Sequence, residues 1–265
     1  MTKRQEGKHN INMNELNERY HKEYTKDFAE RWDDLIDWDG RQKGERRFFE
    51  RLLQEHDVTT VADVASGTGY HAITLARHGF EVVATDGAEN MVEQTRVNAE
   101  QHDVELADIR QVDWRDLSDV YGENSFEAVL CLGNAFTHLF EHEARVEALQ
   151  SMRDVLKPGG VIAIDQRNYD YILNEGYSSK HAFYYTGDDV EAYPVEISPE
   201  AVVFEYQYAD GDTFHLRLFP LKQDYLSELV TEVGFDDVTR FGDFQHPYDD
   251  DVDFIQQIAF KSNGV

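Results

Sequence analysis

The chain has 265 residues, which is long enough for one large α/β domain or for a core with one subdomain. Hydrophobic residues make up 41% and aromatic residues 12% of the composition, so the chain can bury a sizeable core and wholesale disorder is excluded. With 25 basic and 53 acidic residues the formal net charge is −28. Such a surface repels phosphate backbones and anionic lipid, which argues against nucleic acid and membrane as partners.

Other features of the composition predict a cytoplasmic protein. No window holds 18 consecutive apolar residues, as a transmembrane helix would require. The segment from Met1 to Lys8 lacks the apolar stretch of a secretory signal. The single cysteine, Cys131, cannot form an internal disulfide, and a lone thiol suits a reducing compartment.

The acidic residues are dispersed along the chain, and arginines outnumber lysines 16 to 9. This pattern favours a protein that stays soluble at high salt, where ions screen its self-repulsion. An ordinary acidic cytosolic protein is the alternative. The acid recurs in Asp33-Asp34, Asp188-Asp189, Asp236-Asp237 and Asp249-Asp250-Asp251.

Residues 1–57 are expected to form a helical N-terminal segment. Residues 12–57 are rich in charge, and large apolar side chains recur among them at spacings of three or four, the period of an amphipathic helix. These side chains are Tyr20, Tyr24, Phe28, Trp32 and Leu35.

Residues 58–167 alternate short apolar runs with helical stretches, which predicts a parallel, doubly wound sheet. The predicted strands are Thr60–Val64, Glu81–Thr85, Val104–Gln111, Phe126–Leu132 and Val161–Asp165. The predicted helices are Tyr70–His78, Glu89–His102 and Glu141–Leu156, the last ending at Lys157-Pro158-Gly159-Gly160.

The alternation stops after Asp165. Residues 168–220 contain the short alternating runs Ala201–Tyr206 and Thr213–Leu218. Such runs predict antiparallel strands, so we expect these residues to form an inserted β lid above the sheet.

Residues 221–265 are expected to complete the core. They begin with a predicted helix at Gln223–Val233. The runs Phe235–Arg240 and Asp253–Phe260 follow with no helix between them, which predicts a hairpin at the sheet edge.

The first predicted strand leads into a glycine turn, Asp63-Val64-Ala65-Ser66-Gly67-Thr68-Gly69. Glycine lets the backbone approach a ligand closely, just before a helix N-terminus. The second strand ends at Asp86, whose carboxylate could accept both hydroxyls of a nucleoside ribose. A tight strand–helix connection is the alternative for the turn by itself. The glycine turn and the carboxylate at the end of the second strand together predict a nucleoside cofactor. Its predicted contacts include Ala65, Gly67 and Asp86.

The third strand is followed by Asp113-Trp114. This carboxylate and indole could hydrogen-bond an adenine amino group and cover the base, although a turn residue and a core aromatic are the alternatives. Together with the terminal hairpin, these features resemble the class I S-adenosylmethionine-dependent methyltransferases. The resemblance implies a Rossmann-like, seven-stranded sheet and S-adenosylmethionine as the cofactor.

Two segments give a closer resemblance, to glycine N-methyltransferases. They are Leu130-Cys131-Leu132-Gly133-Asn134-Ala135-Phe136-Thr137-His138-Leu139 and Ile164-Asp165-Gln166-Arg167-Asn168-Tyr169-Asp170-Tyr171-Ile172-Leu173. More narrowly, the chain from about Tyr24 onward resembles the prokaryotic glycine/sarcosine N-methyltransferases that begin betaine synthesis in halophiles. This resemblance implies methylation of glycine to sarcosine and of sarcosine to N,N-dimethylglycine, with S-adenosylhomocysteine as co-product and no metal.

These segments supply the predicted acceptor site. Arg167 stands where the family places the arginine that binds the substrate carboxylate, and a planar guanidinium can do this bidentately. A surface ion pair is the alternative for Arg167. The amide oxygen of Asn134 could accept a hydrogen bond from the substrate amine and aim its lone pair, whereas the alternative is a strand-end turn residue.

His138 is the main protonatable candidate near the reaction. By the resemblance, His138 and Leu132 are contacts on the cofactor side, and a packed core histidine is the alternative for His138. We do not assign His138 as the general base, because water can take the proton.

The resemblance also gives roles to residues outside these segments. Tyr24, Trp32 and Arg41 match family positions that close over the cofactor, with Arg41 facing the methionyl carboxylate. An amphipathic helix packed by its aromatic side chains is the alternative for Trp32. In the lid, Tyr185 and Tyr206 match tyrosines that line the substrate pocket.

One departure from the family pattern is Phe219-Pro220, where the animal enzymes carry a tyrosine before the proline. The missing hydroxyl leaves the substrate range open.

Rival functions are the sarcosine/dimethylglycine enzyme of the same pathway, a non-catalytic regulator that binds S-adenosylmethionine or folate, and a nicotinamide-dependent oxidoreductase. The terminal hairpin and Asp113-Trp114 disfavour the oxidoreductase. The sequence does not determine the oligomeric state, and a homo-oligomer is one possibility.

The charge generates a first testable prediction. We expect the melting temperature to rise between low and molar potassium chloride, because salt screens the repulsion within a chain of net charge −28. Thermal unfolding followed by circular dichroism measures this, with sorbitol at matched osmolality as the control. A flat or falling curve in potassium chloride would contradict the halophilic interpretation.

Overall fold

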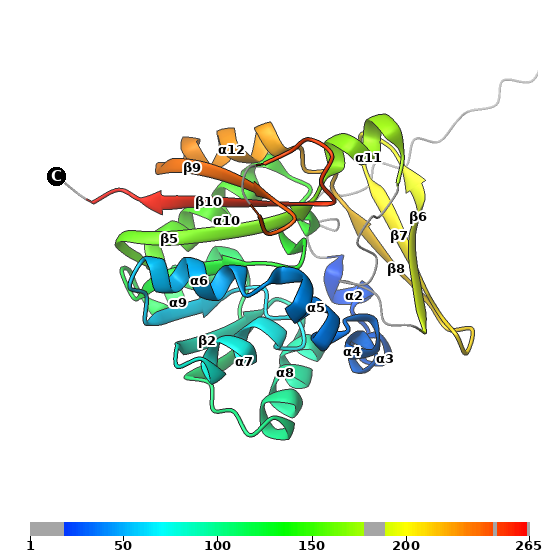
Figure 1. Ribbon diagram of the computed structural model, residues 1–265, viewed down its shortest axis with the longest axis horizontal. Helices are drawn as coiled ribbons and strands as arrows, with labels where there is room; N and C mark the ends of the chain where they lie inside the picture. Colours follow the sequence, from blue (N-terminus) through cyan, green and yellow to red (C-terminus); the bar gives the residue numbers. More distant parts are fainter. Residues whose placement is uncertain (1–18, 178–188, 246–247, 264–265) are drawn as a thin grey trace, which may run out of the picture.

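The computed structural model describes residues 19–177, 189–245 and 248–263. Its centre is a seven-stranded sheet in the order β3-β2-β1-β4-β5-β10-β9 (Figure 1). The pairs among β1 to β5 are parallel, whereas β10 is antiparallel to both β5 and β9. The predicted doubly wound sheet and its terminal hairpin are therefore confirmed.

The strands of this sheet lie close to their predicted positions. They are β1 (Thr60–Asp63), β2 (Glu81–Asp86), β3 (Asp108–Gln111), β4 (Phe126–Cys131), β5 (Leu156–Arg167), β9 (Phe235–Gly242) and β10 (Phe254–Lys261). Two bounds were wrong. Strand β3 begins four residues later than Val104, because its pairing with β2 starts only at Asp108. Strand β5 begins directly at Leu156, and Lys157-Pro158-Gly159-Gly160 forms an irregularity within it where the register against β4 shifts.

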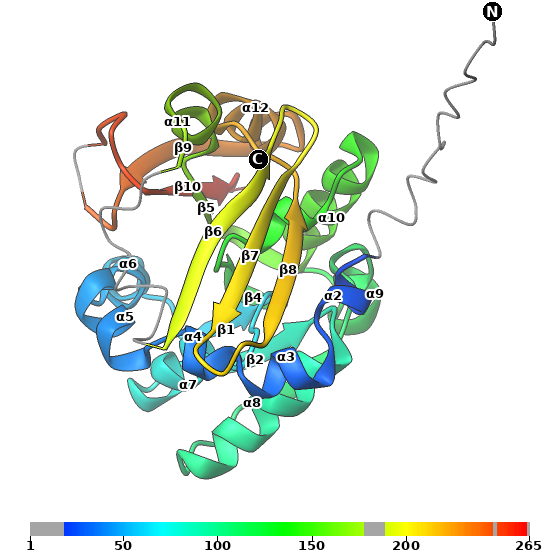
Figure 2. The same cartoon turned by 90° about the vertical axis from the view of Figure 1, so that its right-hand side faces the viewer.

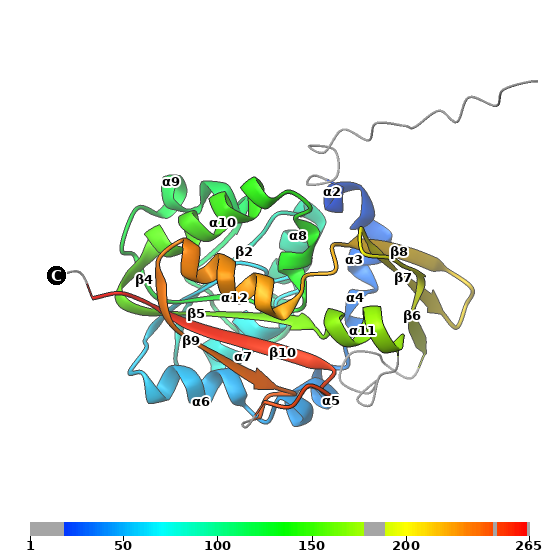
Figure 3. The ribbon, with the colours of Figure 1, turned by 90° about the horizontal axis from the view of Figure 1, so that it is seen from above.

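Helices cover both faces of the sheet (Figure 3). On one face, α6 (Phe48–Glu55) and α7 (Tyr70–Arg77) bury apolar side chains against β1, β2 and β4. On the other, α9 (Leu117–Tyr121), α10 (His142–Val155) and α12 (Gln223–Glu232) do the same. Helix α8 (Glu89–Gln101) packs on β2 and β3. Among the described residues, no helix is long and apolar enough to cross a membrane.

The N-terminal segment is helical but not continuous. It comprises α2 (Tyr20–Glu23), α3 (Lys26–Glu30), α4 (Trp32–Leu35) and α5 (Trp38–Glu45), followed by α6. Two of these helices have a side-chain N-cap. The Thr25 hydroxyl caps α3 by accepting a hydrogen bond from Phe28 N–H, and the Asp37 carboxylate caps α5 by accepting one from Asp39 N–H. The aromatic side chains of this segment pack in two places. Tyr20, Tyr24 and Trp32 contact the start of α8, and Phe28 packs against the lid.

The lid is a three-stranded antiparallel sheet at the carboxyl ends of the parallel strands (Figure 2). It consists of β6 (Val190–Ile197), β7 (Val202–Tyr208) and β8 (Thr213–Leu218), with α11 (Tyr169–Glu175) preceding them. The sequence analysis missed β6, because Pro194 and a mostly exposed pattern hide the strand signal. Its buried partner β7 was predicted.

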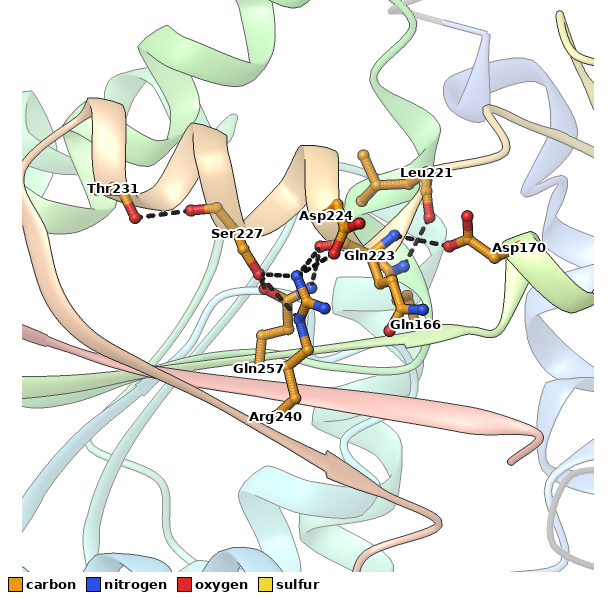
Figure 4. A network of polar contacts seen from close by, with 9 residues as sticks. All are labelled: Gln166, Asp170, Leu221, Gln223, Asp224, Ser227, Thr231, Arg240 and Gln257. Carbon is orange, nitrogen blue, oxygen red and sulfur yellow. Dashed lines mark hydrogen bonds and ion pairs between the residues drawn. The ribbon is translucent and has the colours of Figure 1, made fainter. Parts of the chain in front are cut away.

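A polar network joins the lid to the core (Figure 4). The buried Gln166 amide, just before the lid, donates to the Leu221 carbonyl just after it at 2.6 Å. The Asp170 carboxylate of α11 accepts from Gln223 N–H, the first residue of α12, at 3.0 Å. Arg240 of β9 donates to the Gln223 carbonyl at 3.2 Å. The two crossings between core and lid are therefore tied together.

Candidate active site

One cavity is lined by residues of the N-terminal segment, of the ends of the parallel strands and of the lid. It encloses about 1210 Å³ of space when the solvent at its open mouth is included. Every predicted site residue within the described part of the chain lines it, whereas Tyr185 lies outside the described residues. These residues are Tyr24, Trp32, Arg41, Ala65, Gly67, Asp86, Asp113, Trp114, Leu132, Asn134, His138, Arg167 and Tyr206.

The glycine turn adopts a conformation that favours glycine. Gly67 and Gly69 have φ of +55° and +96°. The Gly67 N–H donates to the Asp86 carboxylate at 3.0 Å, and its carbonyl accepts from the Thr95 hydroxyl of α8 at 2.8 Å. The turn is thus held between β2 and α8, facing the cavity.

Asp86 ends β2, as the sequence analysis predicted. Its two carboxylate oxygens accept hydrogen bonds from Gly67 N–H and from Ala88 N–H at 2.8 Å. A carboxylate has about four acceptor sites, so it can accept a ribose hydroxyl beside these backbone donors. Burial raises the pKa of Asp86 to about 7, although the backbone donors oppose this shift.

Asp113 and Trp114 are more strongly tied to the protein than the sequence analysis anticipated. The Asp113 carboxylate accepts from Arg115 Nε at 2.8 Å and from Nη2 at 2.7 Å. Burial raises the pKa of Asp113, but the hydrogen bonds from Arg115 outweigh it, so the pKa lies below its usual range. The Trp114 indole donates to the Val64 carbonyl at 2.6 Å, which fixes the ring at the cavity wall.

Asn134 lies beyond the end of β4 rather than in it. Its backbone is left-handed, with φ of +63°, and its N–H donates to Asp165 at 2.9 Å. The side-chain oxygen accepts from Arg167 N–H at 2.9 Å, and the side-chain nitrogen donates to the Tyr169 hydroxyl at 2.9 Å. The amide is therefore oriented by the end of β5, and its oxygen keeps one lone pair for a substrate amine.

Arg167 is the last residue of β5, and 8% of it is exposed. Its guanidinium carbon lies 4.8 Å from the Phe204 ring centre and 5.0 Å from that of Phe254. Nη1 donates to the Tyr177 hydroxyl at 3.5 Å. Aromatic rings around a guanidinium exclude water, which strengthens its attraction for a carboxylate.

His138 is paired with Tyr24. Its Nε2 lies 3.0 Å from the Tyr24 hydroxyl, and both side chains line the cavity. Burial lowers the pKa of His138 to about 4, so the ring is neutral near pH 7 and is a weak base. Burial also raises the pKa of Tyr24, which keeps its hydroxyl protonated.

Sequence reasoning missed the residues that hold Arg41. The Arg41 Nε donates to Glu45 at 2.6 Å, and Glu45 also bonds His71 Nε2 at 3.0 Å. Burial raises the pKa of Glu45, but His71 and Arg41 together bring it below its usual value. The guanidinium carbon lies 5.1 Å from the Tyr70 ring centre. The spacing of four between Arg41 and Glu45 on α5 was the signal available in the sequence.

Comparisons with known proteins agree with this architecture. A family model described as a methyltransferase domain matches residues 61–160. A methyltransferase structure from Clostridium acetobutylicum, named as S-adenosylmethionine-dependent, aligns with a TM-score of 0.69 over 89% of this chain and 98% of that one, at 15% identity. This likeness shows the fold.

The sequence relatives are more specific. The glycine/sarcosine N-methyltransferase of Aphanothece halophytica is 44% identical over 91% of both chains. That of Halorhodospira halochloris is 42% identical over 91% of this chain and 90% of its own. The chain belongs to the glycine/sarcosine N-methyltransferase family. This membership excludes a nicotinamide-dependent oxidoreductase.

S-adenosylmethionine is the cofactor, as the methyltransferase domain and the named structural neighbours show, and the residues of the cavity fit it chemically. A carboxylate at Asp86 suits ribose hydroxyls, the guanidinium of Arg41 suits a carboxylate, and Trp114 offers an aromatic face. The polar residues of the cavity come from the N-terminal segment and from the ends of β1 to β5, so the site exists only in the folded chain.

The raised pKa of Asp86 generates a second prediction. Because burial sets this pKa to about 7, the carboxylate ionises over the range in which binding is measured, and only its ionised form accepts two hydroxyls well. Affinity for S-adenosylhomocysteine should therefore increase from pH 6 to pH 8.5. The Asp86→Ala variant should bind about tenfold or more weakly at pH 8.5 and lose this pH dependence.

Isothermal titration calorimetry checks both parts, with circular dichroism to verify that the variant folds. Equal affinity of a folded Asp86→Ala variant and the natural chain would remove Asp86 from the binding site.

Proposed function

We propose that the chain transfers the methyl group of S-adenosylmethionine to glycine, giving sarcosine, and to sarcosine, giving N,N-dimethylglycine. One observation carries the proposal beyond family membership: the guanidinium of Arg167 stands among aromatic rings in the cavity that Asp86 also lines. A carboxylate-bearing amine is the acceptor that such a guanidinium selects.

On the cofactor side, we assign the ribose hydroxyls to Asp86 and the close backbone contacts to Ala65 and Gly67. Asp113 and Trp114 flank the adenine. Tyr24, Trp32 and Arg41 cover the cofactor from the N-terminal segment, with Arg41 on the methionyl carboxylate. Leu132 and His138 complete this side, His138 being held by Tyr24. The bonds that already orient Asp86, Trp114 and His138 support these assignments, because they preorganise the site.

On the acceptor side, Arg167 holds the carboxylate and Asn134 receives a hydrogen bond from the amine. The Arg167 backbone N–H donates to the Asn134 side-chain oxygen at 2.9 Å, which orients the Asn134 amide at the end of β5. Tyr206, buried on the lid strand β7, faces the same cavity. A guanidinium and an amide oxygen that line one cavity suit an acceptor that carries both a carboxylate and an amine.

When bound, S-adenosylmethionine supplies an electrophilic sulfonium methyl group. Attack by a neutral amine requires no covalent intermediate on the protein, so its residues act by orienting the amine and excluding water. His138 stays neutral and is a weak base, because burial lowers its pKa to about 4. We therefore assign it a positioning role and leave the proton to solvent.

The domain assignment follows the same logic. We propose that residues 1–57 form a cover segment, residues 58–167 and 221–265 the cofactor-binding core, and residues 168–220 the substrate lid. The network around Gln166 and Leu221 supports the lid boundaries, since it joins the two crossings. We further propose that the enzyme acts in the cytoplasm, in the early steps of betaine synthesis of a salt-adapted organism, consistent with the −28 charge.

Labelled-methyl transfer to glycine, sarcosine and dimethylglycine, assayed separately in high potassium, tests the proposal. Turnover of glycine and sarcosine supports it. Turnover of sarcosine and dimethylglycine without glycine would assign the chain to the later enzyme, and cofactor binding without any turnover would indicate a regulator.

The acceptor clamp gives a third prediction. Arg167→Lys should strongly reduce kcat/KM for glycine and sarcosine by similar factors, because an ammonium cannot hold a carboxylate bidentately. Cofactor affinity should change little. Steady-state kinetics at saturating cofactor and calorimetry with S-adenosylhomocysteine measure the two effects. Near-normal rates in the lysine variant, or selective loss of cofactor binding, would show that Arg167 is a structural residue.

A further inference from the structure

We infer that Asp33 is a positioning residue that latches the N-terminal segment onto the glycine turn and so holds the cofactor site closed. The inference concerns the cofactor side and does not depend on which amine is methylated. It rests on three donors that converge on one carboxylate from three different elements.

The contacts of Asp33 span the site. The Thr68 hydroxyl in the glycine turn donates to its Oδ1, and the Asn98 amide of α8 donates to its Oδ2. The Trp38 indole, at the start of α5, donates to Oδ1 at 3.0 Å. One side chain on α4 thereby joins the turn, the helix behind it and the next helix of the N-terminal segment.

The turn and α8 are already joined without Asp33. The Asn98 amide also donates to the Thr68 carbonyl at 2.9 Å, and Thr95 donates to the Gly67 carbonyl at 2.8 Å. The turn therefore has its own support from the core. What Asp33 adds is an attachment of the N-terminal segment to this preformed unit.

The N-terminal segment needs such an attachment. Helix α4 has four residues and α5 has eight, and helices of this length are not stable by themselves, so tertiary contacts decide their position. Trp32 precedes Asp33 directly, and its indole nitrogen lies 3.9 Å from where a β-carbon on Gly67 would stand. The Trp38 bond orients the start of α5, one turn before Arg41. Latching by Asp33 thus places both Trp32 and Arg41 at the cavity.

The neighbouring residue Asp34 provides a matched control. It lies on the same short helix and is exposed, and its ion pair with Arg31 is long, at 3.9 Å. Replacing either aspartate by alanine removes the same charge from α4. Only Asp33→Ala removes the acceptor for Thr68, Asn98 and Trp38.

The experiment compares the affinity of the full chain for S-adenosylhomocysteine by calorimetry. We expect Asp33→Ala to bind about tenfold or more weakly and Asp34→Ala to bind within about twofold of the natural chain. Limited proteolysis gives an independent readout. Saturating S-adenosylhomocysteine should protect the segment around Arg31 in the natural chain and in Asp34→Ala, but less in Asp33→Ala.

A second pair of variants changes the donor in the glycine turn, the Thr68 hydroxyl, instead of Asp33. Thr68→Val removes the hydroxyl while keeping its shape, and should weaken binding, whereas Thr68→Ser keeps the hydroxyl and should restore it. The double variant Asp33→Ala/Thr68→Val should lose little beyond Asp33→Ala, because both changes remove one shared bond. A folded Asp33→Ala variant with unchanged affinity, an equal loss in Asp34→Ala, or additive losses in the double variant would each overturn the inference.

Discussion

The carboxyl ends of the parallel strands meet at one edge of the sheet, and the site depends on this alignment. Asp63, Ala84 and Leu130 lie in register across β1, β2 and β4. The cavity residues stand a few positions beyond this line, so the loops that follow the strands bring Gly67 and Asp86 beside each other. Ligand sites in open α/β sheets form at such an edge because these loops can vary while the strands stay fixed.

Buried hydrogen bonds then fix the side chains that the strands deliver. Asn134 is the clearest case, since its amide oxygen, amide nitrogen and backbone N–H are each bonded to a residue of β5 or the chain just after it. The bonds join the β4 loop to Arg167 and Tyr169. The network therefore ties the Asn134 amide to the backbone at the end of β5 and at the start of α11.

The electrostatics of the cavity differ from those of the surface. The chain as a whole carries a net charge of −28, yet the cavity receives two guanidinium groups, from Arg41 and Arg167. Among the acids that line the cavity, burial raises the pKa of Asp86 to about 7, which reduces its average negative charge near neutral pH. Each guanidinium is a group that can bind a carboxylate, so the cavity can receive anionic groups despite the charge of the surface.

Local periodicity and turn residues were enough to predict the order of the core strands and helices, the glycine turn and Asp86 at its strand end, and two contiguous segments that resemble a family pointed to Asn134 and Arg167. Strand β6 was missed because its partner strand, not its own pattern, makes it a strand. The tertiary structure alone decided the pairs Asp33 with Thr68, Tyr24 with His138 and Asn134 with Arg167. Their members stand 35, 114 and 33 residues apart. No local propensity links residues at such separations, since only the packed sheet brings them within hydrogen-bond distance.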